Sequence, residues 1–233
     1  YLRRKYASRD VTFLLQNWEG DWLLRGGAGA TWPPGGPPEA KTRLAALRRW
    51  WAARQRGVAQ ARAETPDSRC RVLHAIEVNR VFDALVGIPT IVADVLPTTP
   101  VDLVSWSSYD GLKHPARLWQ GLEIICHFTP PSPMFDKPTV YLGEIGRPEQ
   151  GRSREEIVDF WDGMFGVFLA QQVPWMFHWE LYCNEPTDKK QADFRVRRAD
   201  ELRGFWLIRP DGSRSFAAEY FVELLKHAGG RLR

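Results

Sequence analysis

The chain has 233 residues, enough to bury a real core in one large domain or two small ones. Its net charge of +4 is mild, and the basic residues are spread along the chain, so composition argues against nucleic acid as a partner. No run approaches the roughly 18 apolar residues of a membrane span. We therefore expect a soluble globular protein that binds neither nucleic acid nor a membrane.

The unusual feature of the composition is its 11 tryptophans. Tryptophan is rarely fully buried and its indole N–H needs a partner, so a core of this size does not account for all of them. Surplus indole rings indicate flat apolar platforms of the kind on which sugar rings stack.

The three cysteines, Cys70, Cys126 and Cys183, stand far apart and have no metal-ligand spacing. We expect reduced thiols, at most one disulfide, no metal and no cofactor. The opening stretch from Tyr1 resembles the end of a helix that is already under way. It suggests the later part of a longer protein, and the sequence assigns no cellular location.

In chain order, strand-like segments alternate with helices or loops. An apolar run from Phe13 first leads into the cluster Asn17-Trp-Glu-Gly-Asp-Trp22, and Gly20 within this cluster is expected to break the strand. Five strands are predicted, at about Val11–Asn17, Arg71–Arg80, Pro100–Ser107, Pro138–Gly146 and Pro174–Tyr182. On the first, alternation places Leu15, Asn17 and Glu19 on one face.

Between the strands, spacing and capping patterns predict helices at about Glu39–Ala63, Ala116–Phe128, from the capping box Ser153–Glu156 to Gln171, and Ser215–Ala228. The Gly- and Pro-rich stretch Gly26–Pro38 predicts a long loop. A short helix or turn should run through Val86, and the β-branched Ile88–Val95 should lead in from it. A charged loop is expected around Asp188–Arg203, followed by a short strand and turn at Gly204–Gly212.

Strand followed by helix, five times over, predicts a parallel sheet with helices outside it. Polar and aromatic residues gather at the carboxyl end of each strand, which is the polarity of a (β/α)8 TIM barrel. A doubly wound open sheet competes with it, but no Gly-rich phosphate loop follows any strand. We predict one partial TIM-type α/β domain over residues 1–233, with about five βα units.

The strand ends resemble a known family. The order of Asn17-Trp-Glu-Gly-Asp-Trp22, His74-Ala-Ile-Glu-Val-Asn79, Val101-Asp-Leu-Val-Ser-Trp-Ser-Ser-Tyr-Asp110, Leu142-Gly-Glu-Ile-Gly146 and Phe177-His-Trp-Glu-Leu-Tyr182 is similar to strands four to eight of retaining glycoside hydrolases of clan A. These are cellulase-like and β-glycosidase-like (β/α)8 enzymes. The resemblance covers roughly residues 11–225.

Carried over position by position, the resemblance implies that Glu19 is the acid/base and Glu144 the nucleophile. Trp179 matches the aromatic residue of strand eight, beneath the cleaved sugar, and Tyr109 an aromatic residue near strand six. The chain departs from the family at Trp18, which separates Asn17 from Glu19 where the family has adjacent Asn and Glu.

The first three strands of the family are absent from the chain. Because a barrel of this kind closes with eight strands, the chain is truncated, is completed by a partner such as a second copy, or is an open partial barrel.

Retaining hydrolysis needs two carboxyl groups about 5–5.5 Å apart, one protonated and the other ionised. Apolar surroundings raise a carboxyl pKa, so Trp18 and Trp22 would suit Glu19 as the acid. Arg147, three residues after Glu144, could keep the nucleophile charged, and a surface role for this arginine is equally compatible with the sequence. An inward-facing Glu144 in line with Val140 and Leu142 would be costly without a function.

The remaining candidates are expected to bind an oligo- or polysaccharide. They are Asn17, Trp18, Trp22, Glu77, Asn79, Trp106, Tyr109 and Trp179. Core packing is the competing role for the tryptophans among them, and Glu77 is also a rival for the acid/base.

Two classes of function remain open. The first is a retaining glycosidase acting on β-linked glycans. The second is a catalytically inactive, incomplete barrel that binds carbohydrate or serves as a scaffold. The separation of the Glu19 and Glu144 carboxyl groups distinguishes them: near 5 Å favours the enzyme, and beyond about 10 Å favours the second class.

Overall fold

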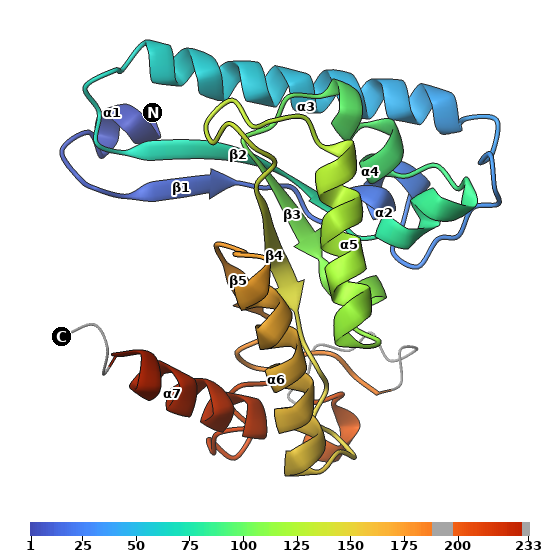
Figure 1. The fold of residues 1–233 in the computed structure, drawn as a ribbon, viewed down its shortest axis with the longest axis vertical. Coiled ribbons are helices and arrows are strands. Elements are labelled where there is room, and N and C mark those ends of the chain that lie inside the picture. The colour runs from blue at the N-terminus through green and yellow to red at the C-terminus, as the bar shows by residue number, and fades with distance from the viewer. Residues whose placement is uncertain (188–197, 230–233) are drawn as a thin grey trace.

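The computed structural model describes residues 1–187 and 198–229. Five parallel strands form one sheet in the order β1-β2-β3-β4-β5, which is also their order along the chain. Their bounds are β1 Thr12–Leu15, β2 Arg71–Val78, β3 Leu103–Ser107, β4 Val140–Ile145 and β5 Met176–His178. The sheet is curled into a half-barrel and helices flank it, so the α/β prediction is confirmed at this level (Figure 1).

Helix α1 precedes β1, and the other helices connect successive strands or follow the last one. The α-helices are α1 Leu2–Lys5, α2 Gly20–Arg25, α3 Ala40–Ala63, α4 Ile91–Asp94, α5 Pro115–Phe128, α6 Arg154–Ala170 and α7 Phe216–Gly229. Short 3-10 helices are η1 Val81–Val86, η2 Leu96–Thr98, η3 Ser108–Gly111 and η4 Ala199–Glu201. The predicted capping box opens α6, where Ser153 and Glu156 cap each other.

Four local predictions were wrong or only partly met. Gly20 begins helix α2 where we expected a break, and Ile88–Val95 contains helix α4. The fifth strand is much shorter than predicted, and Gly204–Gly212 contributes only Ile208 to an isolated bridge with Arg214. Most of the predicted charged loop, residues 188–197, lies outside the described residues.

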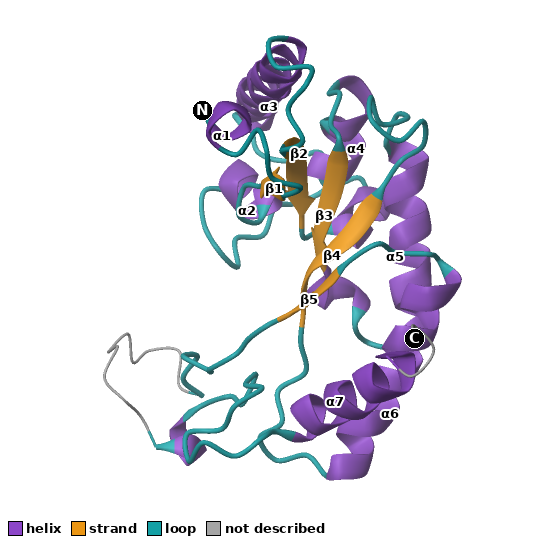
Figure 2. Cartoon of the chain, turned by 90° about the vertical axis from the view of Figure 1, so that its left-hand side faces the viewer, coloured by secondary structure: helices purple, strands orange, loops and turns teal. Residues whose placement is uncertain are grey.

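Helices α3, α5 and α6 lie on one face of the sheet and α7 packs against α6, as the side view shows (Figure 2). On β3, the ring of Trp106 is fully buried against α5, so close that a Cβ added at Gly121 would lie 2.1 Å from it. On β5, His178 packs against the Trp161 ring of α6 at 5.4 Å between centroids. Parallel sheets bury strand residues in this way because each crossover helix returns over the sheet.

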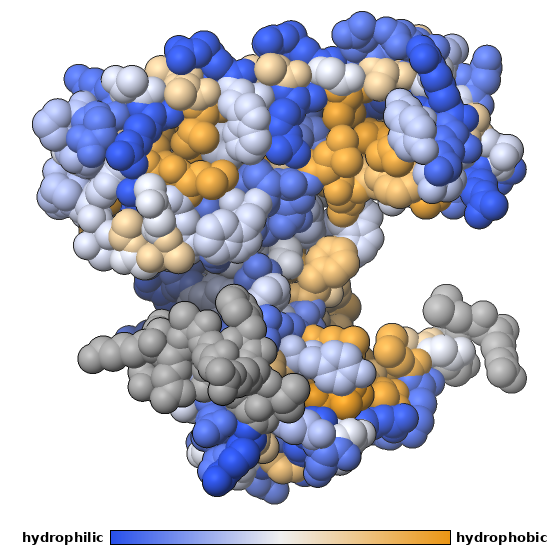
Figure 3. Space-filling view, turned by 180° about the vertical axis from the view of Figure 1, so that it is seen from behind, coloured by the Kyte–Doolittle hydropathy of each residue, from blue (hydrophilic) through white to orange (hydrophobic). Residues whose placement is uncertain are grey.

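The opposite face carries polar and aromatic groups. The ring of Tyr141 on β4 packs there against the rings of Trp175 and Phe177, with 5.9 and 6.1 Å between the ring centroids. Trp175 is 38% exposed and Phe177 49%. From behind, the molecule is hollowed at mid-height and shows apolar side chains (Figure 3). We call the face of the sheet that lies opposite the helices the inner face.

The described helices include none that is long and apolar enough to cross a membrane. All three cysteines are free, as predicted, and Cys70 is buried in a small apolar cluster with Val58 and Val72.

Candidate active site

The first carboxylate, Glu19, stands just beyond β1, at the residue that precedes helix α2. The chain turns sharply there because Gly20 passes close to β2. A Cβ at Gly20 would lie 2.5 Å from the backbone oxygen of Glu77, so only glycine allows this approach. The turn leaves the Glu19 side chain half-buried at the carboxyl end of the sheet.

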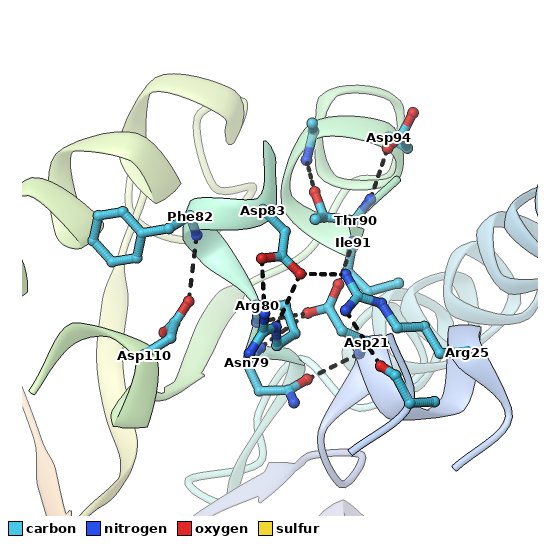
Figure 4. Close-up of polar contacts among 12 residues, drawn as sticks. Asp21, Arg25, Asn79, Arg80, Phe82, Asp83, Thr90, Ile91, Asp94 and Asp110 are labelled. Carbon is cyan, nitrogen blue, oxygen red and sulfur yellow. Dashed lines mark hydrogen bonds and ion pairs between the residues drawn. The ribbon is translucent and has the colours of Figure 1, made fainter. Parts of the chain in front are cut away.

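A buried polar network anchors helix α2 and therefore Glu19 (Figure 4). The carboxylate of Asp21 is fully buried and accepts hydrogen bonds from the backbone N–H groups of Asn79, Arg80 and Ile91, at 3.0, 3.1 and 2.9 Å. In return, the backbone N–H of Asp21 donates to Asn79 Oδ1 at 3.0 Å. A fully bonded network of this kind gives the loop one position.

Glu77 lies beneath Glu19, on the inner face of β2, with no exposed surface. Its carboxylate accepts from the backbone N–H of Glu19 at 2.8 Å, from Gln16 Nε2 at 2.5 Å and from Ser105 Oγ at 2.8 Å. Protein donors therefore surround this carboxylate, which supports Glu19 from below. It is not placed to bind a sugar or to act as the acid/base, the two roles considered for it.

The second carboxylate, Glu144, reaches the inner face through an irregularity in β4. Ser105 pairs with Tyr141 and Trp106 with Leu142, but Ser107 pairs with Glu144, so the register shifts by one residue. Simple alternation would have aligned Glu144 with Val140 and Leu142, and that prediction was wrong. Such a bulge redirects a side chain to the other face of a strand.

The hydroxyl group of Ser107 connects the two predicted catalytic residues. Its Oγ lies 2.8 Å from Glu19 Oε1 and 3.4 Å from Glu144 Oε2. These two carboxylate oxygens are therefore no more than about 6 Å apart, the sum of the two distances. Ser108 adds a hydrogen bond to the backbone oxygen of Glu144 at 2.8 Å.

The carboxylates of the site hold their protons unusually well. Burial raises the pKa of Glu144 to about 7, and the charges of Glu19, Glu77 and Glu185 add to this, against a lowering by the Ser107 hydroxyl. Burial also raises the pKa of Glu77 to about 7. The pKa of Glu19 is raised by burial as well, opposed by hydrogen bonds from Ser107 and Trp22.

Arg147 does not keep Glu144 charged, contrary to one reading of the sequence. Its guanidinium group lies over the ring of Phe160, 5.1 Å from the centroid, and the groups that shift its own pKa besides burial are Arg152 and Glu156. No cation of the described residues contributes to the pKa of Glu144, which is raised where we expected an ionised nucleophile.

Three of the residues expected to bind sugar are committed elsewhere. Asn17 is buried, and its Oδ1 accepts from the indole N–H of Trp51 on α3 at 3.0 Å. It therefore faces α3, as Leu15 does, whereas Glu19 reaches Ser107 on the inner face, so the predicted common face was wrong for Glu19. Asn79 belongs to the Asp21 network, and Trp106 is buried on the outer face against α5.

The other predicted aromatic residues stay near the carboxylates. Trp18 directly precedes Glu19 in the chain and is 54% exposed. The guanidinium carbons of Arg25 and Arg80 lie 6.0 and 5.8 Å from the centroid of the Trp22 ring. Tyr109 follows β3 and is 38% exposed. Burial raises its pKa, and so do the charges of Glu144, Glu185 and Glu19, against a lowering by Arg203.

Trp179 follows β5, and its backbone N–H donates to the oxygen of Ile145 at 2.9 Å, which ties it to the strand that carries Glu144. Its indole N–H donates to Glu185 Oε1 at 2.8 Å.

Sequence reasoning missed five residues of the site: Gln16, Ser105, Ser107, Tyr141 and Glu185. Two of them had a signal, because serine at alternate positions of the apolar strand Leu103–Ser107 indicates a polar inner face. Gln16 and Tyr141 bond to each other across the sheet, and Glu185 reaches the site from a loop, so neither contact follows from spacing.

Among the described residues, no group of His, Cys, Asp and Glu is arranged to hold a metal ion. Comparison with protein-family models, with curated proteins and with solved structures found no match. We therefore infer the function from the site itself.

Proposed function

We propose that the chain is a retaining glycosidase acting on β-linked oligo- or polysaccharides, built on a partial barrel of the TIM type. The observation that carries this proposal is the Ser107 bridge, which limits the distance between the nearest oxygens of Glu19 and Glu144 to about 6 Å. That distance fits direct attack by a carboxylate, whereas inverting enzymes keep about 6.5–9.5 Å to hold a water.

In the first step, the Glu144 carboxylate attacks the anomeric carbon and forms an ester bond to it. The glycosidic C–O bond breaks, its electron pair passes to the leaving oxygen, and the Glu19 carboxyl group protonates that oxygen. In the second step, the Glu19 carboxylate takes a proton from water, whose oxygen attacks the same carbon and releases Glu144 as a carboxylate. The double displacement requires no cofactor.

The charge state of the resting pair gives Ser107 a role in this mechanism. Because the pKa of Glu144 is about 7, its carboxyl group is partly protonated at neutral pH. Ser107 can accept that proton on Oγ while passing its own to Glu19, which yields an acid at Glu19 and an ionised Glu144. A hydroxyl group placed between the two carboxylates can therefore prepare both for the first step.

The test is chromophore release from aryl β-glycosides by the wild type and by Glu144→Gln, Glu19→Gln and the surface control Glu155→Gln. We expect Glu144→Gln to lose activity by at least about a thousandfold and the control to retain it. Activity that survives Glu144→Gln would contradict the nucleophile assignment.

A second arm separates the two roles. Azide should rescue Glu144→Ala with formation of an α-glycosyl azide, because azide attacks from the face that the nucleophile occupied. It should rescue Glu19→Ala with a β-glycosyl azide, because azide then replaces water on the glycosyl-enzyme. The reverse pairing of products would exchange the two assignments.

The exposed inner face favours a second candidate, an inactive barrel that binds carbohydrate. Trp175 and Phe177 present large aromatic surfaces there. In this case the wild type would bind an insoluble β-glycan as tightly as the Glu19→Gln/Glu144→Gln double variant, with no sugar released by either.

A further inference from the structure

A loop beyond β5 brings a fourth carboxylate to the site. The segment 180–187 pairs with residues 201–208 through backbone bonds, among them Glu180 N–H to Phe205 oxygen at 2.7 Å and Arg203 N–H to Glu185 oxygen at 2.9 Å. These bonds and the bridge between Pro186 and Leu202 hold the two segments side by side. Glu185 therefore belongs to a paired and defined part of the loop.

The carboxylate of Glu185 has two partners on different elements. One oxygen accepts the indole N–H of Trp179 at 2.8 Å, and the other forms an ion pair with Arg203. Arg203 is held in turn by the ring of Phe205, 4.7 Å from its guanidinium carbon, and Phe205 meets Tyr109 edge to face at 6.1 Å. The orientation of the Trp179 ring thus depends on Glu185, and that of Glu185 on Arg203.

Glu185 also acts on the charges of the site. Its negative charge raises the pKa of Glu144, Glu19 and Tyr109. Within residues 1–187 and 198–229, the titratable groups that face it are Arg203, Glu180, Tyr109, Glu19 and Glu144. Arg203 is the one cation among them, and it pairs with Glu185 directly, which anchors the charge without removing its effect on the carboxylates.

We propose that Glu185 is a positioning residue of this site: held in place by Arg203, it orients the Trp179 indole as a sugar platform. The inference deepens the proposed glycosidase function and rests on it. It explains why a charged residue, rather than a neutral acceptor, receives the indole N–H.

The experiment uses Glu185→Gln, which keeps an acceptor oxygen but loses the charge, and Glu185→Ala, which loses both. Asp200→Asn, an exposed carboxylate of the same loop region paired with Arg198, is the matched control. The measurements are KM and kcat for aryl β-glycosides against pH, the indole ¹⁵N–¹H signal of Trp179, assigned with Trp179→Phe, and the ¹³C-carboxyl titration of Glu144.

For Glu185→Gln we expect the titration midpoint of Glu144, and the ascending limb of the pH profile, to fall by about half a pH unit or more, with KM little changed. For Glu185→Ala we expect KM to rise about tenfold and the Trp179 indole signal to shift and broaden. Asp200→Asn should leave all readouts at wild-type values.

An indole signal of Trp179 that does not move in Glu185→Ala would overturn the inference, whatever the midpoint of Glu144 does in Glu185→Gln. The two signals are recorded without substrate, so they separate it from the proposed function. If the wild type released no chromophore while both signals moved as expected, the glycosidase proposal would fail and the structural role of Glu185 would stand.

Discussion

Ser107 has one hydroxyl hydrogen and two carboxylates within reach. It can donate a hydrogen bond to only one of them at a time. The other carboxyl group either is protonated and donates to Ser107 Oγ, or makes no hydrogen bond to it. The arrangement therefore couples the titration of Glu19 to that of Glu144. The pH dependence of activity will report apparent pKa values that belong to the pair rather than to either residue.

Glu77 leads to a prediction at the residue scale because its pKa, ordinarily 4.5, is raised to about 7 by burial. Between these values the unfolded chain releases a proton that the folded protein retains. Stability contributed by Glu77 is thus full below pH 4.5 and declines as the pH rises toward 7. We expect the stability of the wild type relative to Glu77→Gln to fall across this window, measured by urea unfolding at several pH values.

The comparison with Glu77→Gln removes the contributions of His74 and His178, whose pKa values are lowered to about 4 by burial in both proteins. The charge of Glu77 raises the pKa of Glu144, so the substitution lowers that pKa and changes the stability difference in the same direction. A stability difference that stayed constant from pH 4.5 to 7.5 would contradict the raised pKa of Glu77.

At the scale of elements, the irregularity of β4 decides where Glu144 points. It requires glycine at position 143, where an added Cβ would lie 1.9 Å from Ser105 Oγ and 2.7 Å from Glu77 Oε2. The strand can pass this close to the polar floor of the site only without a side chain. A change at this one position should disturb both the strand and the carboxylates.

We therefore expect Gly143→Ala to lower the free energy of unfolding by about 2–4 kcal/mol, and to reduce any glycosidase activity more than stability alone explains. Gly166→Ala is the matched control, since nothing lies within 4 Å of its added Cβ and it stands inside helix α6. There, alanine should be neutral or stabilise by up to about 1 kcal/mol. Urea unfolding of the two variants gives the comparison, and equal stabilities would refute the packing argument.

At the scale of the whole molecule, the half-barrel leaves β1 and β5 with one edge each that no described strand pairs with. It also exposes Trp175 and Phe177 on the inner face. Parallel sheets are ordinarily covered on both faces, and unpaired edges attract further strands. We propose that a second copy closes the sheet into a barrel of ten strands, five from each chain, with β5 of each chain beside β1 of the other.

The prediction is a mass near twice 26.8 kDa by light scattering at tens of micromolar protein, with dissociation on dilution. Phe177→Glu should shift the equilibrium toward the monomer, because it places a charge on the face to be covered. Leu225→Glu, on the exposed side of α7, should not. A wild type that remains monomeric at every concentration would rule out this mode of completion.

The sequence by itself determined the alternation of strands and helices, the parallel sheet and the start of α6 at Ser153. These features follow from local periodicity and capping, which involve residues a few positions apart. It also indicated Glu19 and Glu144 as the carboxylates to compare. Only the tertiary structure decided that Glu144 and Ser107 share the inner face, that Trp106 is buried against α5, and that Glu77 lies beneath Glu19. Each depends on register and contacts between distant strands, which no local pattern encodes.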